Sequence, residues 1–92
     1  MKNLTINEFM DLASGKKWNV NTLIPDFGLG VAIIGATVTM DEGSNSIAIY
    51  NDGCTFTIEE CDDTITAIEQ DGESITVNLF NLPDLTFTES IF

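Results

Sequence analysis

The hydrophobic pattern of this chain changes its period at Trp18, and this change restricts the available folds more than any other feature. After Trp18, apolar and polar residues alternate in short segments, as in strands with one buried face. The turn sequences NDG (51–53) and DG (71–72) between such segments are typical of hairpins. We therefore predict an antiparallel meander of five or six strands, drawn from residues 31–39, 46–50, 54–59, 64–69, 74–80 and 85–92.

The N-terminal segment instead has the signals of a capped helix over about residues 5–14. Thr5 and Glu8 have the spacing of a capping box, and Leu4 and Phe9 that of a hydrophobic staple. Gly15 is placed to end the helix in a left-handed conformation. The face predicted to dock on the rest of the protein consists of Ile6, Phe9, Met10 and Ala13.

The alternation also predicts which side chains of the strands face the core. In the segment 54–59, Cys54, Phe56 and Ile58 are expected to point inward. Ile68 breaks the alternation of its segment, which indicates a bulge there. Residues 19–29 have the least regular pattern, and no strand is predicted for them.

Together these elements predict an α+β fold with one short N-terminal helix. The helix is expected to pack on a strongly bent antiparallel sheet, or small open β-barrel, of five to six strands within about residues 31–91. With 92 residues, the chain is long enough for one modest core, so a single domain over 1–92 is expected.

The charge of the chain is strongly negative and unevenly distributed. The net charge is −12, and all three bases (Lys2, Lys16 and Lys17) lie in the first seventeen residues. From Trp18 onward there are thirteen acids and no base. Because phosphate binding needs Lys or Arg, we expect no direct contact with nucleic acid or an anionic membrane. The charge favours a basic protein as partner, although it also serves solubility by itself.

The residue types argue against an enzyme, a cofactor site and a metal site. The chain has no His, and two Cys without His cannot complete a structural zinc site within one chain. The segment 30–37 resembles a phosphate loop but has Ala36 where Lys is needed. Cys54 and Cys61 are predicted to be free thiols, and the start of the chain lacks a secretory apolar region, so we expect a cytoplasmic protein.

The segment 59–74 is the most acidic part of the chain and is our candidate partner-binding site. Exposed aromatics near it would be candidate interface anchors. Alternation leaves Trp18, Tyr50 and Phe80 least clearly buried, and Phe92 is the last residue of the sequence. We expect its acids to form one patch. They are Glu59, Glu60, Asp62, Asp63, Glu69, Asp71 and Glu73.

In size and charge, the chain resembles the small acidic inhibitors that phages direct against host defence, including anti-CRISPR proteins and DNA mimics. That resemblance implies an interaction protein that inhibits or sequesters a basic, nucleic-acid-handling partner. The alternative hypothesis is a structural or assembly protein, such as a small virion or scaffold component that forms a homodimer or larger homo-oligomer. Its basis is a β-rich chain with sheet edges available for pairing.

Overall fold

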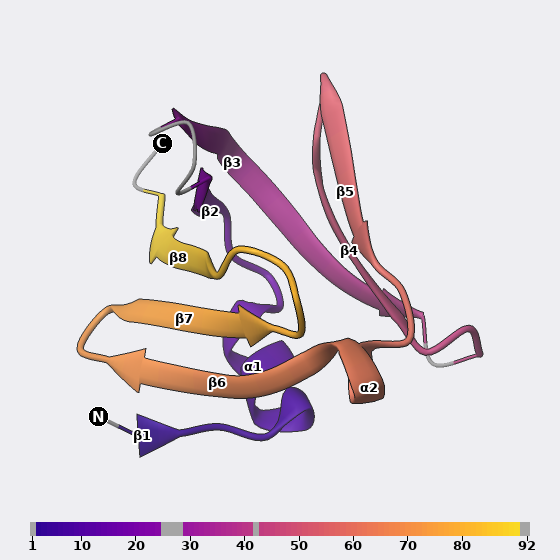
Figure 1. The fold of residues 1–92 in the computed structure, drawn as a ribbon. Coiled ribbons are helices and arrows are strands. Elements are labelled where there is room, and N and C mark those ends of the chain that lie inside the picture. The colour runs from indigo at the N-terminus through magenta and orange to yellow at the C-terminus, as the bar shows by residue number, and fades with distance from the viewer. Residues whose placement is uncertain (1, 25–28, 42, 91–92) are drawn as a thin grey trace.

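The computed structural model describes residues 2–24, 29–41 and 43–90 (Figure 1). Its α+β class and its short N-terminal helix confirm the sequence prediction, but the sheet formed by these residues has eight strands rather than five or six. The helices are α1 (Ile6–Ala13) and α2 (Cys61–Thr64). The strands are β1 (Lys2–Asn3), β2 (Trp18–Ile24), β3 (Leu29–Asp41), β4 (Ser46–Asn51), β5 (Cys54–Ile58), β6 (Ile65–Asp71), β7 (Ser74–Leu79) and β8 (Leu85–Glu89).

All pairings in the sheet are antiparallel, and the strand order is β1-β6-β7-β8-β2-β3-β4-β5. Most neighbours in this order are also neighbours in the sequence, as expected of a meander. The exceptions are the two N-terminal strands. β1 adds to β6, and β2 lies between β8 and β3. The sheet stays open, with β1 and β5 at its two edges.

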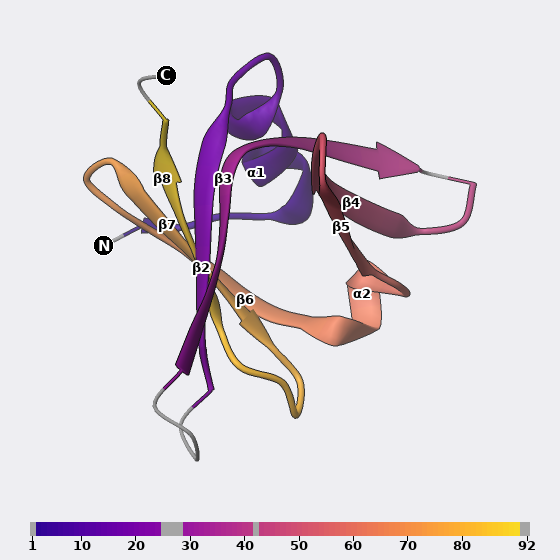
Figure 2. The same cartoon turned by 90° about the horizontal axis from the view of Figure 1, so that it is seen from above.

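The sheet bends sharply in the middle of β3, where Figure 2 shows the strand turning from β2 towards β4. Residues up to Ala36 pair with β2, and residues from Thr37 onward pair with β4. Gly35 has a φ of 68°, a left-handed conformation that glycine adopts without steric cost. Two asparagines hold the bend, because Asn19 Oδ1 accepts from Gly35 N–H at 3.2 Å and Asn51 Nδ2 donates to the Ile34 carbonyl at 3.2 Å.

The sequence prediction for residues 19–29 was wrong, because β2 and the start of β3 occupy much of this segment. Trp18 and Val20 are buried, while Asn19 and Asn21 alternate with them. Asn is depleted in strands, so this alternation was not a visible strand signal. The register of β2 against β3 also shifts between Trp18 and Val20, which interrupts the regular pairing.

The helix α1 confirms the predicted cap. Glu8 N–H donates to Thr5 Oγ1 at 3.1 Å, and Thr5 N–H donates to Glu8 Oε1 at 3.0 Å. Gly15 has a φ of 77°, as predicted for the residue that ends the helix. Phe9 and Ala13 are buried, so the predicted apolar face does dock on the sheet.

Three aromatic rings tie the helix to the sheet at the centre of the core. The ring of Phe87 lies 5.2 Å from that of Phe9 and 6.4 Å from that of Trp18, both edge to face. Trp18 Nε1 donates to the Ala13 carbonyl at 3.2 Å, so its buried polar atom is satisfied. No helix among the described residues has the length and apolar character to span a bilayer.

Both predicted hairpins are present, and β6 contains a bulge near Ile68 but not at it. Asn51 pairs with Cys54, and Asp71 pairs with Ser74, each across a two-residue turn. The irregularity in β6 lies between Ile65 and Ala67, just before the predicted position.

The predicted burial of β5 needs a correction, although Phe56 and Ile58 do point to the inner face, opposite the buried Ile49 and Ile47. Ile58 is buried, but Cys54 is exposed and Phe56 is 39% exposed. β5 is an edge strand, and the inner face of the sheet is only partly covered there.

Candidate protein-interaction surface

The structure brings together four of the seven predicted acids at the junction of β5 and α2. Glu59 and Glu60 connect the two elements, and Asp62 and Asp63 lie in α2 itself. All four are exposed. We call Glu59, Glu60, Asp62 and Asp63 the acidic corner.

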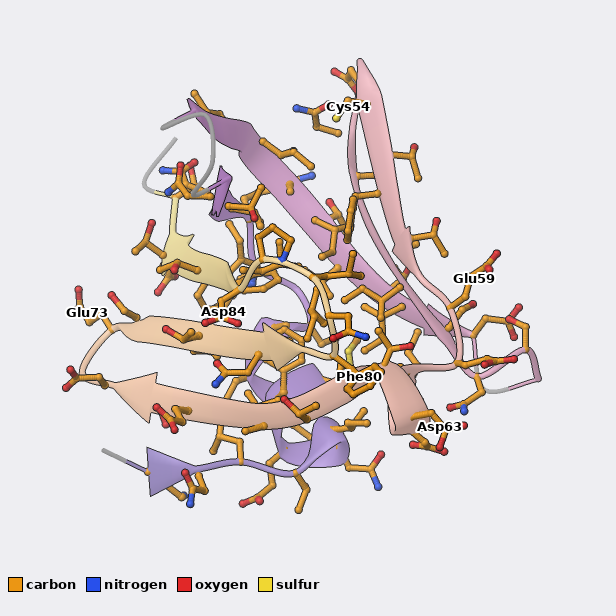
Figure 3. The ribbon with its side chains drawn as sticks, viewed as in Figure 1. Cys54, Glu59, Asp63, Glu73, Phe80 and Asp84 are labelled. Atoms are coloured by element: carbon orange, nitrogen blue, oxygen red, sulfur yellow. The ribbon has the colours of Figure 1, made fainter. Side chains whose placement is uncertain are left out.

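The other three predicted acids lie at the far end of β6. Glu69 and Asp71 belong to β6, and Glu73 lies in the turn that follows it. Figure 3 shows Glu73 on the opposite side of the molecule from Glu59 and Asp63. Along β6, Glu69 lies about 13 Å and Asp71 about 20 Å from Ile65, the residue that follows α2. The expected patch of seven acids is therefore two separate groups.

Backbone hydrogen bonds fix the shape of the acidic corner. Glu60 has a φ of 49°, and its carbonyl accepts from the N–H groups of Asp63 and Thr64 at 2.9 Å each. The Thr64 hydroxyl donates to the Glu59 carbonyl at 2.8 Å. These bonds hold the backbone of the corner in one conformation, and they use backbone groups and the Thr64 hydroxyl rather than the carboxylates.

Cys61 fastens the corner to the connection between β3 and β4. Its N–H donates to the Asn45 carbonyl at 2.9 Å, and its Sγ lies 3.1 Å from Asn45 Oδ1. Burial raises the pKa of the Cys61 thiol, and the charge of Asp62 raises it further. A thiol held protonated is a poor nucleophile. Cys54 is also free but exposed, near the opposite end of β5 (Figure 3).

No cation neutralises the acidic corner within the described part of the chain. Among the described residues, the one ion pair lies away from the corner and joins Lys16 Nζ to Glu89 Oε2 at 3.8 Å. Lys17 Nζ is also remote from the corner and donates to Thr37 Oγ1 at 2.8 Å. The described residues contain no group of three or more His, Cys, Asp or Glu placed to hold a metal ion. The negative charge of the corner is consequently available to a partner.

An apolar surface adjoins the acidic corner. Phe80 is 63% exposed and Leu82 is 53% exposed, both in the connection from β7 to β8. Phe80 N–H donates to the Thr64 carbonyl at 2.8 Å, which places this connection directly against α2. Figure 3 shows Phe80 beside α2, nearer the centre of the view than Glu59 and Asp63.

A groove of about 250 Å³ runs between β5 and this connection. We call it the β5 groove. One wall belongs to β5 and its end, the other to the ends of α2 and β7 and the loop beyond. Its lining residues are Phe56, Thr57, Ile58, Glu59, Thr64, Leu79 and Leu82. Four of these residues are apolar, and Glu59 adds a carboxylate to the lining.

The predicted interface aromatics differ in their exposure. Trp18 is buried in the core, Tyr50 is 37% exposed, Phe80 is prominent, and Phe92 lies outside the described residues. Sequence reasoning missed Phe56, because alternation alone does not show that its strand is at an edge.

A second hollow of about 450 Å³ lies over the bend in β3, between Lys17, Ile34 and Tyr50. Among the described residues that line it, Lys17 is the one cation and already bonds to Thr37, and the others include no catalytic pair. The acidic corner with the β5 groove therefore remains the better candidate site. Comparison of this chain with protein-family models, curated proteins and solved structures found no match.

Proposed function

We propose that this chain is a non-enzymatic interaction protein that binds a cationic, nucleic-acid-handling protein and thereby inhibits or sequesters it. The observation that carries the proposal is the acidic corner, where four exposed carboxylates on a hydrogen-bonded turn have no described cation beside them. Exposed apolar side chains flank it, so the surface offers both charge and an anchor for a partner.

The physical basis is competition with phosphate. Lys and Arg side chains that hold a nucleic-acid backbone can pair equally with carboxylates in a fixed arrangement. The net charge of −12 also steers a cationic partner towards this protein and accelerates their encounter. Occupying a phosphate-binding groove in this way blocks the nucleic acid, which is the mode of action of a phage-type anti-defence protein. Two free thiols support a reducing compartment such as the cytoplasm.

A homo-oligomer is the second candidate, and the β5 groove with its exposed Phe56 favours it. However, a second copy on this surface would bring its own acidic corner to the same place. Like charges that meet at an interface oppose association. A cationic partner can cover the apolar surface and also pair with the carboxylates. A second copy can cover only the apolar surface.

The test compares two variants with the same change in net charge at opposite ends of the molecule. E59K/D63K alters the acidic corner, and D71K/E73K alters the distant group. Each immobilised protein is exposed to the heparin-binding fraction of a cell lysate at about 50 and 500 mM NaCl, a range over which exposed charge interactions are strongly screened. Duplex DNA is then added as a competitor.

Wild type and D71K/E73K are expected to retain the same proteins at low salt and to release them at high salt or with DNA. E59K/D63K should retain them at least about tenfold less well, a loss of roughly 1.4 kcal/mol in binding. Equal loss in both variants would mean that only net charge matters. Retention unchanged in E59K/D63K would remove the acidic corner from the interface.

A further inference from the structure

The two edges of the sheet are protected to very different degrees. β1 has only two residues and carries Lys2, two features that discourage the addition of another strand. β5 has five residues and includes no Lys, no Pro and no charge. Its residues from Cys54 to Thr57 are all exposed. β5 is therefore an edge that can accept a further strand.

The hairpin between β4 and β5 fixes which peptide groups point to this open edge. Asn51 and Cys54 flank a two-residue turn, so they form a hydrogen-bonded pair. Bonded pairs alternate along an antiparallel ladder, so Phe56 and Ile58 also direct their peptide groups towards β4. The N–H and C=O groups of Thr55 and Thr57 face outward. β5 has no other strand partner among the described residues.

A strand added at the open edge would also cover exposed apolar surface on the inner face of the sheet. Phe56 pairs with Ile49, and Ile58 pairs with Ile47, so their side chains lie on the inner face of the sheet. Ile58 is only 4% exposed, whereas Phe56 is 39% exposed and forms part of the β5 groove. Phe56 also borders a cavity of about 40 Å³ beside Leu85, so the inner layer is incompletely filled there.

We propose that an extended segment of the cationic partner pairs with β5 as a ninth strand. The peptide groups of this segment form hydrogen bonds with those of Thr55 and Thr57. Every second side chain of the segment is apolar, covers Phe56 and enters the β5 groove. The intervening side chains are Lys or Arg and reach the carboxylates around the strand. This inference rests on the proposed function and specifies the chemistry of the partner at the same surface.

Charge identifies this occupant. Glu59 lines the groove at one end of β5, and Asp52 lies in the turn at the other end. A second copy pairing with β5 in the antiparallel direction would place its own Glu59 near Asp52, and its own Asp52 near Glu59. Like charges facing each other across strands are destabilising. A basic strand has the opposite effect at both ends.

The experiment uses two synthetic heptapeptides of equal charge, one alternating lysine with valine and one alternating lysine with serine. Binding to the full chain is measured by calorimetry, and amide hydrogen exchange is followed by NMR. The lysine–valine peptide should bind at least about tenfold more tightly, because only its alternate side chains bury apolar area in the groove. Exchange should slow at the amides of Thr55 and Thr57 and change little at Phe56, whose N–H is already bonded to β4.

A matched pair of variants tests the backbone contact itself. Thr57→Pro removes one outward N–H while keeping the bonds to β4, and proline is tolerated in this position of an edge strand. Thr57→Val keeps that N–H and replaces the hydroxyl with a methyl group of similar size. T57P should bind the lysine–valine peptide about tenfold less tightly than T57V. Circular dichroism of the two variants checks that β5 is still formed, and the exchange measurement on wild type remains decisive if T57P does not fold.

Equal binding of the two peptides with no protection at Thr55 and Thr57 would overturn strand addition. If E59K/D63K still abolished capture in that case, the proposed function would stand without it. Strand addition would also be overturned by protection that appears at Lys2 and Asn3 instead, because the peptide would then occupy β1. Failure of both peptides to bind, together with capture unchanged in E59K/D63K, would overturn both proposals.

Discussion

Asn19 and Asn51 act on the same bend from its two sides. Asn19 reaches Gly35 from β2, and Asn51 reaches Ile34 from the end of β4. Each side chain bonds a backbone group at the point where β3 changes its partner. The bend is therefore determined by a few residues, and Gly35 is the one whose backbone conformation disfavours any side chain.

Gly35→Ala should destabilise the protein by about 1–2 kcal/mol, the cost of a left-handed conformation for a residue with a Cβ. Space is not limiting, because no atom lies within 4 Å of the added carbon. Gly53→Ala is the matched control, since its added carbon makes only an ordinary 3.9 Å contact. Urea unfolding followed by circular dichroism measures both. Similar stability of G35A and wild type would contradict a bend that depends on glycine.

The two thiols should differ sharply in reactivity. Cys54 is exposed, while burial and Asp62 raise the pKa of Cys61. At pH 8, Ellman's reagent should titrate one thiol rapidly and the second only after unfolding. Cys54→Ser should remove the fast phase. Because the folded protein holds the Cys61 proton more tightly than the unfolded chain, Cys61 favours folding less as the pH rises above the ordinary value of 9.0. A fast phase that survives in C54S would contradict this assignment.

At the scale of elements, α1 depends on local signals, since the capping box fixes its start and the helix has only eight residues. Thr5→Ala should cost about 1 kcal/mol, whereas Thr5→Ser keeps the hydroxyl and should cost much less. The bonds from Thr5, backbone first, lower the pKa of Glu8. The contribution of Glu8 is therefore present above the ordinary carboxyl pKa and is lost as the pH falls through the lowered value. Thermal unfolding at pH 7 and pH 3 measures both effects, and equal stability of T5A and T5S would contradict the cap.

Elements defined by local chemistry could be predicted from the sequence, and those defined by distant pairing could not. The helix, both hairpins and the strands from β4 to β8 follow from caps, turns and alternation. β1 has two residues, too few to show a period, and it exists because it pairs with Gln70 and Glu69. β2 alternates Trp and Val with Asn, and its strand conformation depends on burial between β3 and β8.

The candidate site shows the same limit. Its acidic corner could be predicted, because four acids near one turn must stay near one another. The remaining three acids are close to it in sequence but not in space, because the extended strand β6 carries them away. The groove could not be predicted, because Phe56 and Leu82 become neighbours only through the tertiary fold.

At the scale of the whole molecule, the chain has fifteen acids and three bases, so repulsion between like charges destabilises the folded state. Raising NaCl from about 20 to 500 mM should raise the melting temperature by about 2–5 °C, as screening relieves the repulsion. The melting temperature of D71K/E73K, which has a net charge of −8 instead of −12, should rise less with salt. A melting temperature that falls with salt would show that ion pairing outweighs repulsion. Differential scanning calorimetry measures both proteins.

The position of β2 between β3 and β8 has a consequence during synthesis. Trp18 is made early, but its partner strand β8 leaves the ribosome almost seventy residues later. Until then the ring of Phe87 is missing from the aromatic core, and one side of β2 has no hydrogen-bonding partner. A nascent chain that stops before Leu85 can form its local helix and hairpins but cannot assemble the native sheet.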